Sequence, residues 1–299
     1  MKPVCIICNS ASSFLMKKDG YDLYRCPSCS LVFVHPQPAS DFLKDKVYSF
    51  ESGYQSNKKG DFGETIPDKK TEKIMDFLKG NVVKGKLLDV GCSSGEFMYH
   101  AGKLGFDTYG VELNKRTADV ARSYGLNVFN GFLKDANFAQ DSFDVIFLGD
   151  IIEHVNSPRE FIQDCHRLLK RGGLIIISTP NLDCIWSRMT FQLYRWFNIP
   201  WSSVTPPYHL FQFSFNNINR LMRDEAFSLI SQFYLHPPRL MYELGSMHLL
   251  KKYKENKSIL RLLYMTFAFG AYTKLYILDR LLTPLKKRDF SMVTFYTKF

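Results

Sequence analysis

The sequence predicts an α/β protein in which a small cysteine-rich module precedes a doubly wound, mostly parallel sheet. Two observations indicate this fold class. Short apolar runs alternate with segments of helical spacing between residues 86 and 178, and four of the seven cysteines form close pairs near the N-terminus. Alternating units with buried strands are typical of parallel sheets covered by helices on both faces. The 299 residues, 45% of them hydrophobic, suffice for about two domains and exclude a disordered chain.

The cysteine-rich module is expected to span residues 1–38. It contains strand-like runs at residues 21–25 and 31–34 and ends at the breaker sequence His-Pro-Gln-Pro of residues 35–38. Two Cys-x2-Cys pairs separated by 17 residues complete one tetrahedral Zn²⁺ site, and four thiolates leave no open position, so the zinc would be structural. The expected ligands are Cys5, Cys8, Cys26 and Cys29.

Residues 39–80 are expected to form a helical linker that covers the cofactor, with a helical pattern at residues 70–78. The α/β core follows from residue 81. Its expected elements, in order, are strand 87–90, helix 97–104, strand 107–113, helix 116–124, strands 127–130 and 143–148, a helix that begins at Ser157-Pro158 and is ended by Gly172-Gly173, and strand 174–178.

The rest of the core domain, which extends to residue 299, begins with an aromatic-rich lid at residues 181–217 that is too irregular for a sheet strand. A helix at residues 216–224 and strands at 227–235 and 292–298 follow. Between those two strands lies a helical insert, residues 240–285.

The insert has two interpretations. Its apolar residues between Leu262 and Leu282 lie on nearly every side, which favours a buried helical hairpin packed on the lid. Its basic flanks, Lys251-Lys252 and Lys286-Lys287-Arg288, favour instead a peripheral element at an anionic membrane surface. The longest uncharged apolar run near the C-terminus, residues 262–273, is too short to span a bilayer, so no transmembrane segment is predicted.

A turn rich in small residues, Asp89-Val-Gly91-Cys-Ser93-Ser-Gly95, follows the first core strand and opens a helix. Small residues let a ligand approach the outward-pointing N–H groups of a helix start. The third glycine of a dinucleotide fingerprint is missing, which favours another adenosine-bearing ligand. Glu112 ends the second strand, where a carboxylate can accept both ribose hydroxyls.

These motifs resemble class I S-adenosylmethionine (SAM)-dependent methyltransferases over about residues 70–235. The resemblance rests on Leu-Leu-Asp-Val-Gly-Cys-Ser-Ser-Gly-Glu-Phe, Tyr-Gly-Val-Glu, Ser-Phe-Asp-Val-Ile, Ile-Glu-His-Val and Leu-Leu-Lys-Arg-Gly-Gly. It implies a Rossmann-like sheet with one antiparallel strand. The preceding four-cysteine ribbon, with Ser-Thr-Pro-Asn and a later Pro-Tyr-His, is similar to methyltransferases of bacterial glycan and polysaccharide pathways.

The resemblance implies that SAM is the cofactor. The turn would border its methionine part, Glu112 its ribose and residues 131–133 its adenine, while Asp89 would orient the turn and the cofactor amine. The family usually has a glycine where this chain has Ser93, which could tighten the turn. The implied cofactor-binding residues are Asp89, Gly91, Ser93, Gly95, Glu112, Gly131, Leu133 and Gly149.

Candidate catalytic residues follow the strand at 143–148, beside the first core strand in the family's sheet. Transfer to a hydroxyl requires alignment with the methyl group and removal of a proton, a task that suits an imidazole. His154 is the first candidate base and His209 the second. Asp150 and Glu153, with both histidines, also resemble the divalent-metal sites of some O-methyltransferases, so a second metal ion is a further hypothesis.

The favoured function is methylation of a small molecule or glycan, such as a sugar or sugar nucleotide. The net charge of +10 also suits nucleic acid, and a zinc ribbon on this core resembles a ribosomal RNA methyltransferase family, which is the alternative. A non-catalytic binding protein is a third reading. Residues 1–8 lack the apolar stretch of a secretion signal, so a cytoplasmic location is expected.

Overall fold

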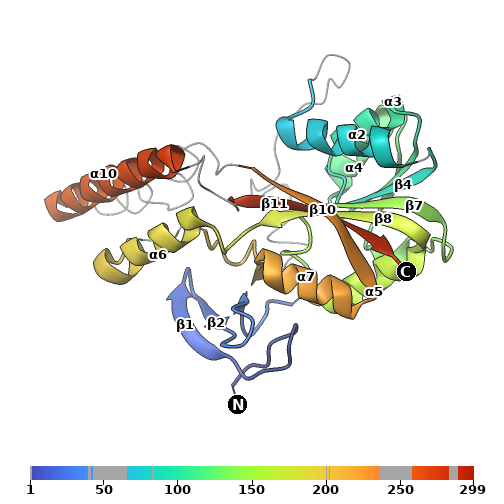
Figure 1. Cartoon of the computed structure of the whole chain (residues 1–299). Helices are drawn as coiled ribbons and strands as arrows, with labels where there is room; N and C mark the ends of the chain where they lie inside the picture. The colour runs from blue at the N-terminus through green and yellow to red at the C-terminus, as the bar shows by residue number, and fades with distance from the viewer. Residues whose placement is uncertain are drawn as a thin grey trace.

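The computed structural model of the chain describes residues 2–39, 42, 66–82, 84–199, 201, 203–235, 258–282 and 289–299. Within these ranges the strands form a sheet of seven and a sheet of four. In Figure 1 the N-terminal strands of the smaller sheet, blue, lie below helix α6 (Ile185–Phe197) and beside helix α7 (Phe215–Asp224).

The large sheet has the order β10-β11-β8-β7-β4-β5-β6. Strand β11 is antiparallel to both of its neighbours, and the four pairings from β8 to β6 are parallel. The predicted α/β class, with one antiparallel strand, is therefore confirmed. The strands are β4 (Lys86–Val90), β5 (Asp107–Glu112), β6 (Asn127–Asn130), β7 (Phe143–Gly149), β8 (Leu169–Pro180), β10 (Phe227–Leu235) and β11 (Ser291–Lys298).

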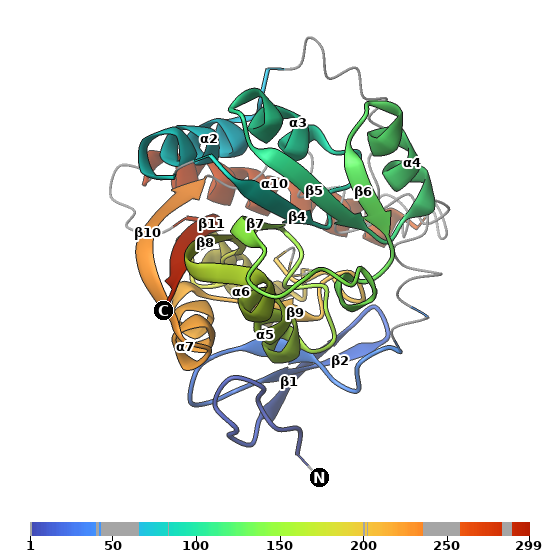
Figure 2. The same ribbon diagram turned by 90° about the vertical axis from the view of Figure 1, so that its right-hand side faces the viewer.

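Helices cover both faces of this sheet because its central strands alternate their side chains (Figure 2). In β7, Val145 and Phe147 pack with α2 (Lys69–Asn81) and α3 (Glu96–Lys103). The intervening Ile146 and Leu148 share the opposite cluster with α5 (Pro158–Leu168) and α7. Helix α4 (Lys115–Ser123) packs on the same side as α3, through Ala118 and Ala121.

The transition from α5 to β8 differs from the prediction. The helix ends at Leu168 and the strand begins at Leu169, five residues before the expected start. Gly172, in the left-handed region with φ +74°, lies where the β7–β8 register jumps, so the glycines interrupt a strand instead of ending a helix. Ser157 stands at the N-cap of α5, but its side chain makes no capping hydrogen bond.

The small sheet joins the cysteine module to the lid. Its strands are β1 (Ser13–Lys18), β2 (Tyr21–Arg25), β3 (Val32–Val34) and β9 (Phe211–Gln212), in that order. The expectation that residues 181–217 contain no sheet strand is wrong, because β9 pairs antiparallel with β3. Lys18 strengthens the junction by donating to the backbone oxygens of Trp201, at 2.7 Å, and Val204.

The lid and the described part of the insert form a pair of helices, α6 and α10 (Ile259–Leu281), which project from one side of the large sheet (Figure 1). The ring of Trp186 packs edge-on against Tyr272 and Tyr276. The interpretation of a helix buried on nearly every side is wrong: only Ala268, Tyr272 and Asp279 of α10 are buried. None of the described helices combines the length and apolarity that crossing a membrane requires.

Parts of the predicted linker and insert lie outside the described residues. These are 40–41 and 43–65 of the linker, 240–257 and 283–285 of the insert, and the basic flanks at 251–252 and 286–288.

Candidate functional site

Most of the predicted site residues lie at the carboxyl edge of the large sheet. The turn 91–95 follows β4, Glu112 ends β5, and Gly149 and Asp150 stand at the end of β7. Strand β4 pairs with β5 on one side and with β7 on the other, so the chain reverses its strand order between β4 and β7. Ligands of open α/β sheets bind at such a point.

The turn after β4 requires small residues for two reasons. Gly91, Ser93 and Gly95 all have positive φ, of +77°, +50° and +87°. A Cβ on Gly95 would lie 2.3 Å from Leu126 Cδ1 and 3.2 Å from Ala121 Cβ, so Leu126 would have to move to make room for it. The turn is thus fixed by its own conformation and by the packing of α3, with the N-terminus of that helix at the sheet edge.

Glu112 ties this turn to the end of β5. Its Oε2 accepts a hydrogen bond from the Ser93 backbone N–H at 2.8 Å, and its Oε1 accepts one from Asn114 N–H at 2.7 Å. A carboxylate has about four acceptor positions, more than these two bonds use.

The adenine end of the predicted site lies one strand further along. The backbone N–H of Gly131 donates to the Glu112 carbonyl oxygen at 3.1 Å. Leu133, 7% exposed, begins a short 3₁₀ helix, η3 (Leu133–Asp135). Gly149 sits over the Phe147 ring, where a Cβ would come within 2.7 Å. The structure therefore gathers the implied cofactor-binding residues along the ends of four adjacent strands.

This edge carries an excess of carboxylates. Burial, and secondarily the nearby Glu112, raise the pKa of Asp89 to about 8, against the opposing effect of Lys70. Asp150 and Glu153 lie on the loop after β7. A ligand with positive charge would relieve this repulsion.

Lys70 is a site residue that the sequence analysis missed. Its Nζ lies 2.5 Å from Asp150 Oδ2, and the Ser178 hydroxyl donates to Asp150 Oδ1 at 2.7 Å. Partial burial raises the pKa of Asp150, but the Lys70 ammonium and the Ser178 hydroxyl outweigh it, so the pKa lies below its ordinary value. Lys70 comes from α2, 80 residues earlier, and a lone lysine in a helix gives no sequence signal for such a contact. Ser178 gives a weak signal, because a polar residue at the end of the predicted apolar strand 174–178 indicates a polar partner.

The two candidate bases lie together beside this pair. The rings of His154 and His209 meet edge to face, with centroids 4.9 Å apart. His154 Nδ1 lies 2.5 Å from the Tyr208 carbonyl oxygen, which can only accept, so Nδ1 carries the proton and Nε2 is the basic nitrogen of the neutral ring. Burial lowers the pKa of His154, and burial and the neighbouring His154 lower that of His209 to about 3. Both imidazoles are therefore neutral at pH 7.

The lid is anchored to the loop that carries these residues. The backbone N–H groups of Leu210 and Phe211 donate to the Glu153 carbonyl oxygen at 2.8 and 3.2 Å. The Glu153 side chain is 1% exposed, and burial, followed by Asp150, raises its pKa to about 8. Neither carboxyl oxygen accepts a well-formed hydrogen bond from a described residue.

A divalent cation could be held by only part of the predicted set. Glu153, His154 and His209 each offer a ligand atom within 4.8 Å of the others. Asp150 is not in this group and is bound to Lys70 and Ser178 instead.

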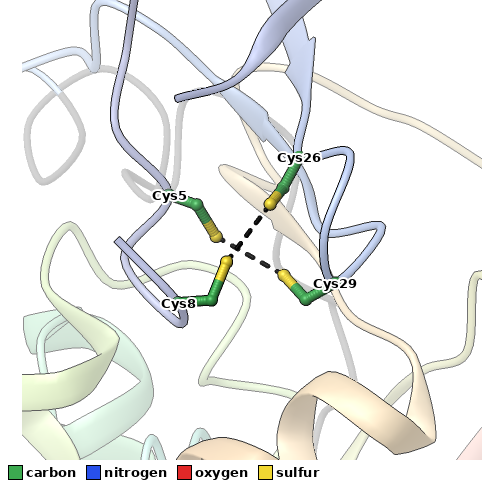
Figure 3. A group of neighbouring side chains, drawn as sticks. All are labelled: Cys5, Cys8, Cys26 and Cys29. Atoms are coloured by element: carbon green, nitrogen blue, oxygen red, sulfur yellow. Dashed lines mark hydrogen bonds between the residues drawn. The ribbon is translucent and has the colours of Figure 1, made fainter. Parts of the chain in front are cut away.

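The four ribbon cysteines converge on one point (Figure 3). The Cys5 and Cys29 sulfurs are 3.5 Å apart, those of Cys8 and Cys26 are 3.3 Å apart, and all four lie within 4.8 Å of one another. In a tetrahedron with Zn–S bonds of about 2.3 Å the sulfurs stand about 3.8 Å apart. The arrangement fits a four-thiolate zinc ion, and none of the seven cysteines is in a disulfide.

A family model described as a methyltransferase domain matches residues 62–232, more than half of the chain. The chain belongs to this methyltransferase family. The match includes the turn after β4, Glu112 and the loop after β7, and ends within β10. The prediction of a class I SAM-dependent methyltransferase domain is thereby confirmed.

Curated relatives include two enzymes named ubiquinone biosynthesis O-methyltransferase. The one from Cereibacter sphaeroides is 35% identical over 102 residues, covering 32% of this chain and 41% of that protein. The one from Maricaulis maris is 37% identical over 103 residues, covering 32% and 41%. Among the first relatives found, the matched region spans between 41% and 53% of the relative's length.

Two solved structures share the fold. A SAM-dependent methyltransferase from Archaeoglobus fulgidus matches with a TM-score of 0.51 and 15% identity, over 77% of this chain and 91% of that one. Phosphoethanolamine N-methyltransferase 2 from Haemonchus contortus, in complex with SAM, matches with a TM-score of 0.54 and 16% identity, over 89% and 61%. These similarities establish the architecture of the methyltransferase domain.

Proposed function

We propose that the chain is a SAM-dependent methyltransferase that methylates a hydroxyl group of a small molecule or glycan, such as a sugar or sugar nucleotide. The observation that carries the proposal is the neutral His154 imidazole, held at Nδ1 by the Tyr208 carbonyl, on the loop that follows the central strand β7. The relatives named as O-methyltransferases support oxygen as the accepting atom.

The residues at the sheet edge fit SAM. Its amino and sulfonium groups are positive, which suits the carboxylates of Asp89, Glu112 and Asp150. Glu112 would accept from the ribose, the turn 91–95 would approach the methionine part, and Gly131 to Leu133 would border the adenine. When bound, SAM supplies an electrophilic methyl group.

His154 serves as the general base in this proposal. A hydroxyl loses its proton as it attacks, and Nε2 of His154 accepts that proton while Nδ1 stays bonded to the Tyr208 carbonyl. The negative charge of Asp150 stabilises the imidazolium that forms, because it raises the pKa of His154 against the larger, lowering effect of burial. His209 is the reserve base, with a pKa lowered further, to about 3.

The N-terminal module is proposed to hold one structural Zn²⁺ through its four cysteines. The organisation proposed from the sequence, a ribbon at residues 1–38, a cover at 39–80 and a methyltransferase domain from 81 to 299, is kept. A paired-cysteine zinc site is typical of a reducing compartment, which supports the cytoplasmic location that we propose. A second divalent ion at Glu153, His154 and His209 is a subsidiary proposal.

The exposed face of α6 and α10 is proposed to contact an anionic membrane surface. Leu260 is 75% exposed, Leu263 62% and Trp196 70%, which leaves a large apolar surface around the Phe197–Phe267 ring contact. Three of the four charged side chains of α10 are basic and exposed, namely Arg261, Lys274 and Arg280. The fourth, Asp279, is buried. Aromatic and aliphatic groups beside cations are the composition of an interfacial helix.

Mass spectrometry of acceptor pools tests the proposed reaction. The full-length protein is incubated with methyl-labelled SAM and, in parallel, with nucleotide sugars, an extract of glycans and total RNA. Label in a sugar or small-molecule hydroxyl, lost with His154→Ala, supports the proposal. Label in RNA alone would instead establish the RNA methyltransferase alternative.

A further inference from the structure

A second polar cleft lies between the cysteine module and the lid, apart from the residues assigned to SAM and to the base. Its volume is about 720 Å³, within the range of small-molecule sites. Residues of the ribbon form one wall, and residues of α6 and the start of α7 form the other. In Figure 1 this is the region where the blue strands β1 and β2 face α6 and α7.

The cleft is strongly basic. Four arginines line it, and its only acidic lining residue is Asp183. Asp183 pairs with Arg188. The other three arginines come from three different elements and are Arg25, Arg195 and Arg220. None of them makes an ion pair with a residue in the described part of the chain. Three positive charges therefore line one cavity, and none of them is paired with a carboxylate of the described residues.

Two buried polar groups along the same cleft lack partners. Ser187 and Asn217 are each 1% exposed, and neither the Ser187 hydroxyl nor the Asn217 side-chain amide nitrogen makes a hydrogen bond to a described residue. The Asn217 Oδ1 is already used, because it accepts from Ser214 N–H at 2.8 Å. The unused groups of the cleft are thus mainly hydrogen-bond donors, and buried donors are costly to leave unpaired.

We propose that this cleft binds the phosphate groups of the acceptor, in the form of a diphosphate ester. Phosphate oxygens only accept hydrogen bonds, and guanidinium groups bind them in a planar, two-bond geometry. Three arginines without a carboxylate partner, in a cleft of this size, suit a diphosphate with an attached group better than a single small anion. The arginines converge on one cavity instead of following a track over the surface, which favours a compact ligand over a nucleic acid strand.

The inference rests on the proposed function and adds the chemical class of the acceptor. The length of chain between the cleft and the candidate base shows that the two sites are close. Ser178, which contacts Asp150, lies four residues before Leu182 in the cleft wall. His209 lies five residues before Ser214, which also lines the cleft. A chain spans at most about 3.6 Å per residue, so these Cα atoms are within about 14 and 18 Å of each other. One ligand could therefore place its diphosphate in the cleft and its hydroxyl near His154.

Calorimetric titration of the full-length, zinc-loaded protein tests the inference without requiring methyl transfer. The probes are inorganic pyrophosphate, ADP and farnesyl diphosphate, which separate the diphosphate group itself from a nucleotide-linked or a lipid-linked source. Arg220→Gln is compared with Arg223→Gln, a matched exposed arginine on the same helix that does not line the cleft. SAM is titrated into every sample as a separate measurement.

We expect pyrophosphate to bind the unaltered protein, with affinity reduced about tenfold or more by Arg220→Gln and unchanged by Arg223→Gln. Tighter binding of ADP or of farnesyl diphosphate, with the same dependence on Arg220, identifies the source. Absence of binding by all three probes, or equal losses in both variants, overturns the inference. So does Arg220-dependent binding of an RNA oligonucleotide without binding of pyrophosphate. SAM binding is measured separately in every sample. A failure of diphosphate binding can therefore be distinguished from a failure of the proposed methyltransferase function.

Discussion

His154 and Tyr208 are joined by a hydrogen bond between the imidazole Nδ1 and the backbone carbonyl oxygen, at 2.5 Å, across 54 residues of sequence. This bond fixes the tautomer and leaves Nε2 as the acceptor. Because Tyr208 belongs to the lid, the contact also makes the base dependent on the position of the segment proposed to cover the acceptor.

Replacement of His154 by alanine is expected to lower turnover about a hundredfold and to leave SAM affinity nearly unchanged, because proton transfer is lost and the adenosine contacts are not. Initial rates with labelled SAM and calorimetry with SAM measure the two effects. His166→Ala, on α5, is the matched control and should retain full turnover. Equal turnover in His154→Ala and the unaltered protein, with a large loss in His209→Ala, would transfer the role of base to His209.

The pH dependence of turnover follows from the lowered pKa of His154. A general base works only when deprotonated, so turnover should fall as the pH drops through the His154 pKa, and burial places that pKa below its ordinary value of 6.5. We expect a constant rate from pH 7 upward to the onset of other ionisations and an acidic limb centred below pH 6.5. An acidic limb centred above pH 6.5 at saturating SAM would contradict this assignment.

Metal analysis of the reductively purified protein is expected to find one zinc per chain. The small ribbon has little apolar area to bury, so metal binding must supply much of its folding free energy. Cys8→Ala should lose the zinc, whereas Cys165→Ala, on the buried face of α5, should keep it. Less than half an equivalent in the unaltered protein argues against the site. A second equivalent that disappears in His209→Ala would establish the additional cation near Glu153.

Flotation with anionic vesicles at low salt tests the membrane surface proposed for α6 and α10. The intact protein should float, and Leu263→Glu should reduce flotation severalfold, because it puts a negative charge into the exposed apolar face. Ile230→Glu, an exposed position on β10, is the control and should float normally. If the intact protein stays at the bottom of the gradient, the membrane proposal is wrong and a soluble acceptor, such as a sugar nucleotide, is favoured.

Local patterns predicted the large sheet because each strand–helix unit carries its own signals. The strands at residues 127–130 and 227–235 have the predicted bounds, and Gly125, with φ +76°, follows α4 as its stop signal indicated. The residues around β8 were misplaced because Gly172 can serve equally a helix end or a strand irregularity, and only the partner strand β7 decides.

Long-range pairings account for the features that sequence could not supply. Strand β9 has two residues and exists because β3 lies beside it, so it has no periodicity to detect. The Lys70–Asp150 pair and the convergence of Arg25 with Arg220 depend on tertiary packing in the same way. The sequence shows that α10 is apolar. It does not show which of its side chains are buried, because that depends on how much of the helix α6 covers.

The central claim, that SAM binds at the carboxyl edge with its ribose on Glu112, is tested most directly by calorimetric titration of SAM into three forms of the full-length protein. The unaltered protein should bind one SAM per chain. Asp107→Ala, at the opposite end of β5, should bind equally well, and Glu112→Ala should lose about 1 to 3 kcal/mol, because the ribose and the Ser93 N–H both lose their acceptor. Failure of the unaltered protein to bind SAM, or an affinity unchanged by Glu112→Ala, would contradict the account.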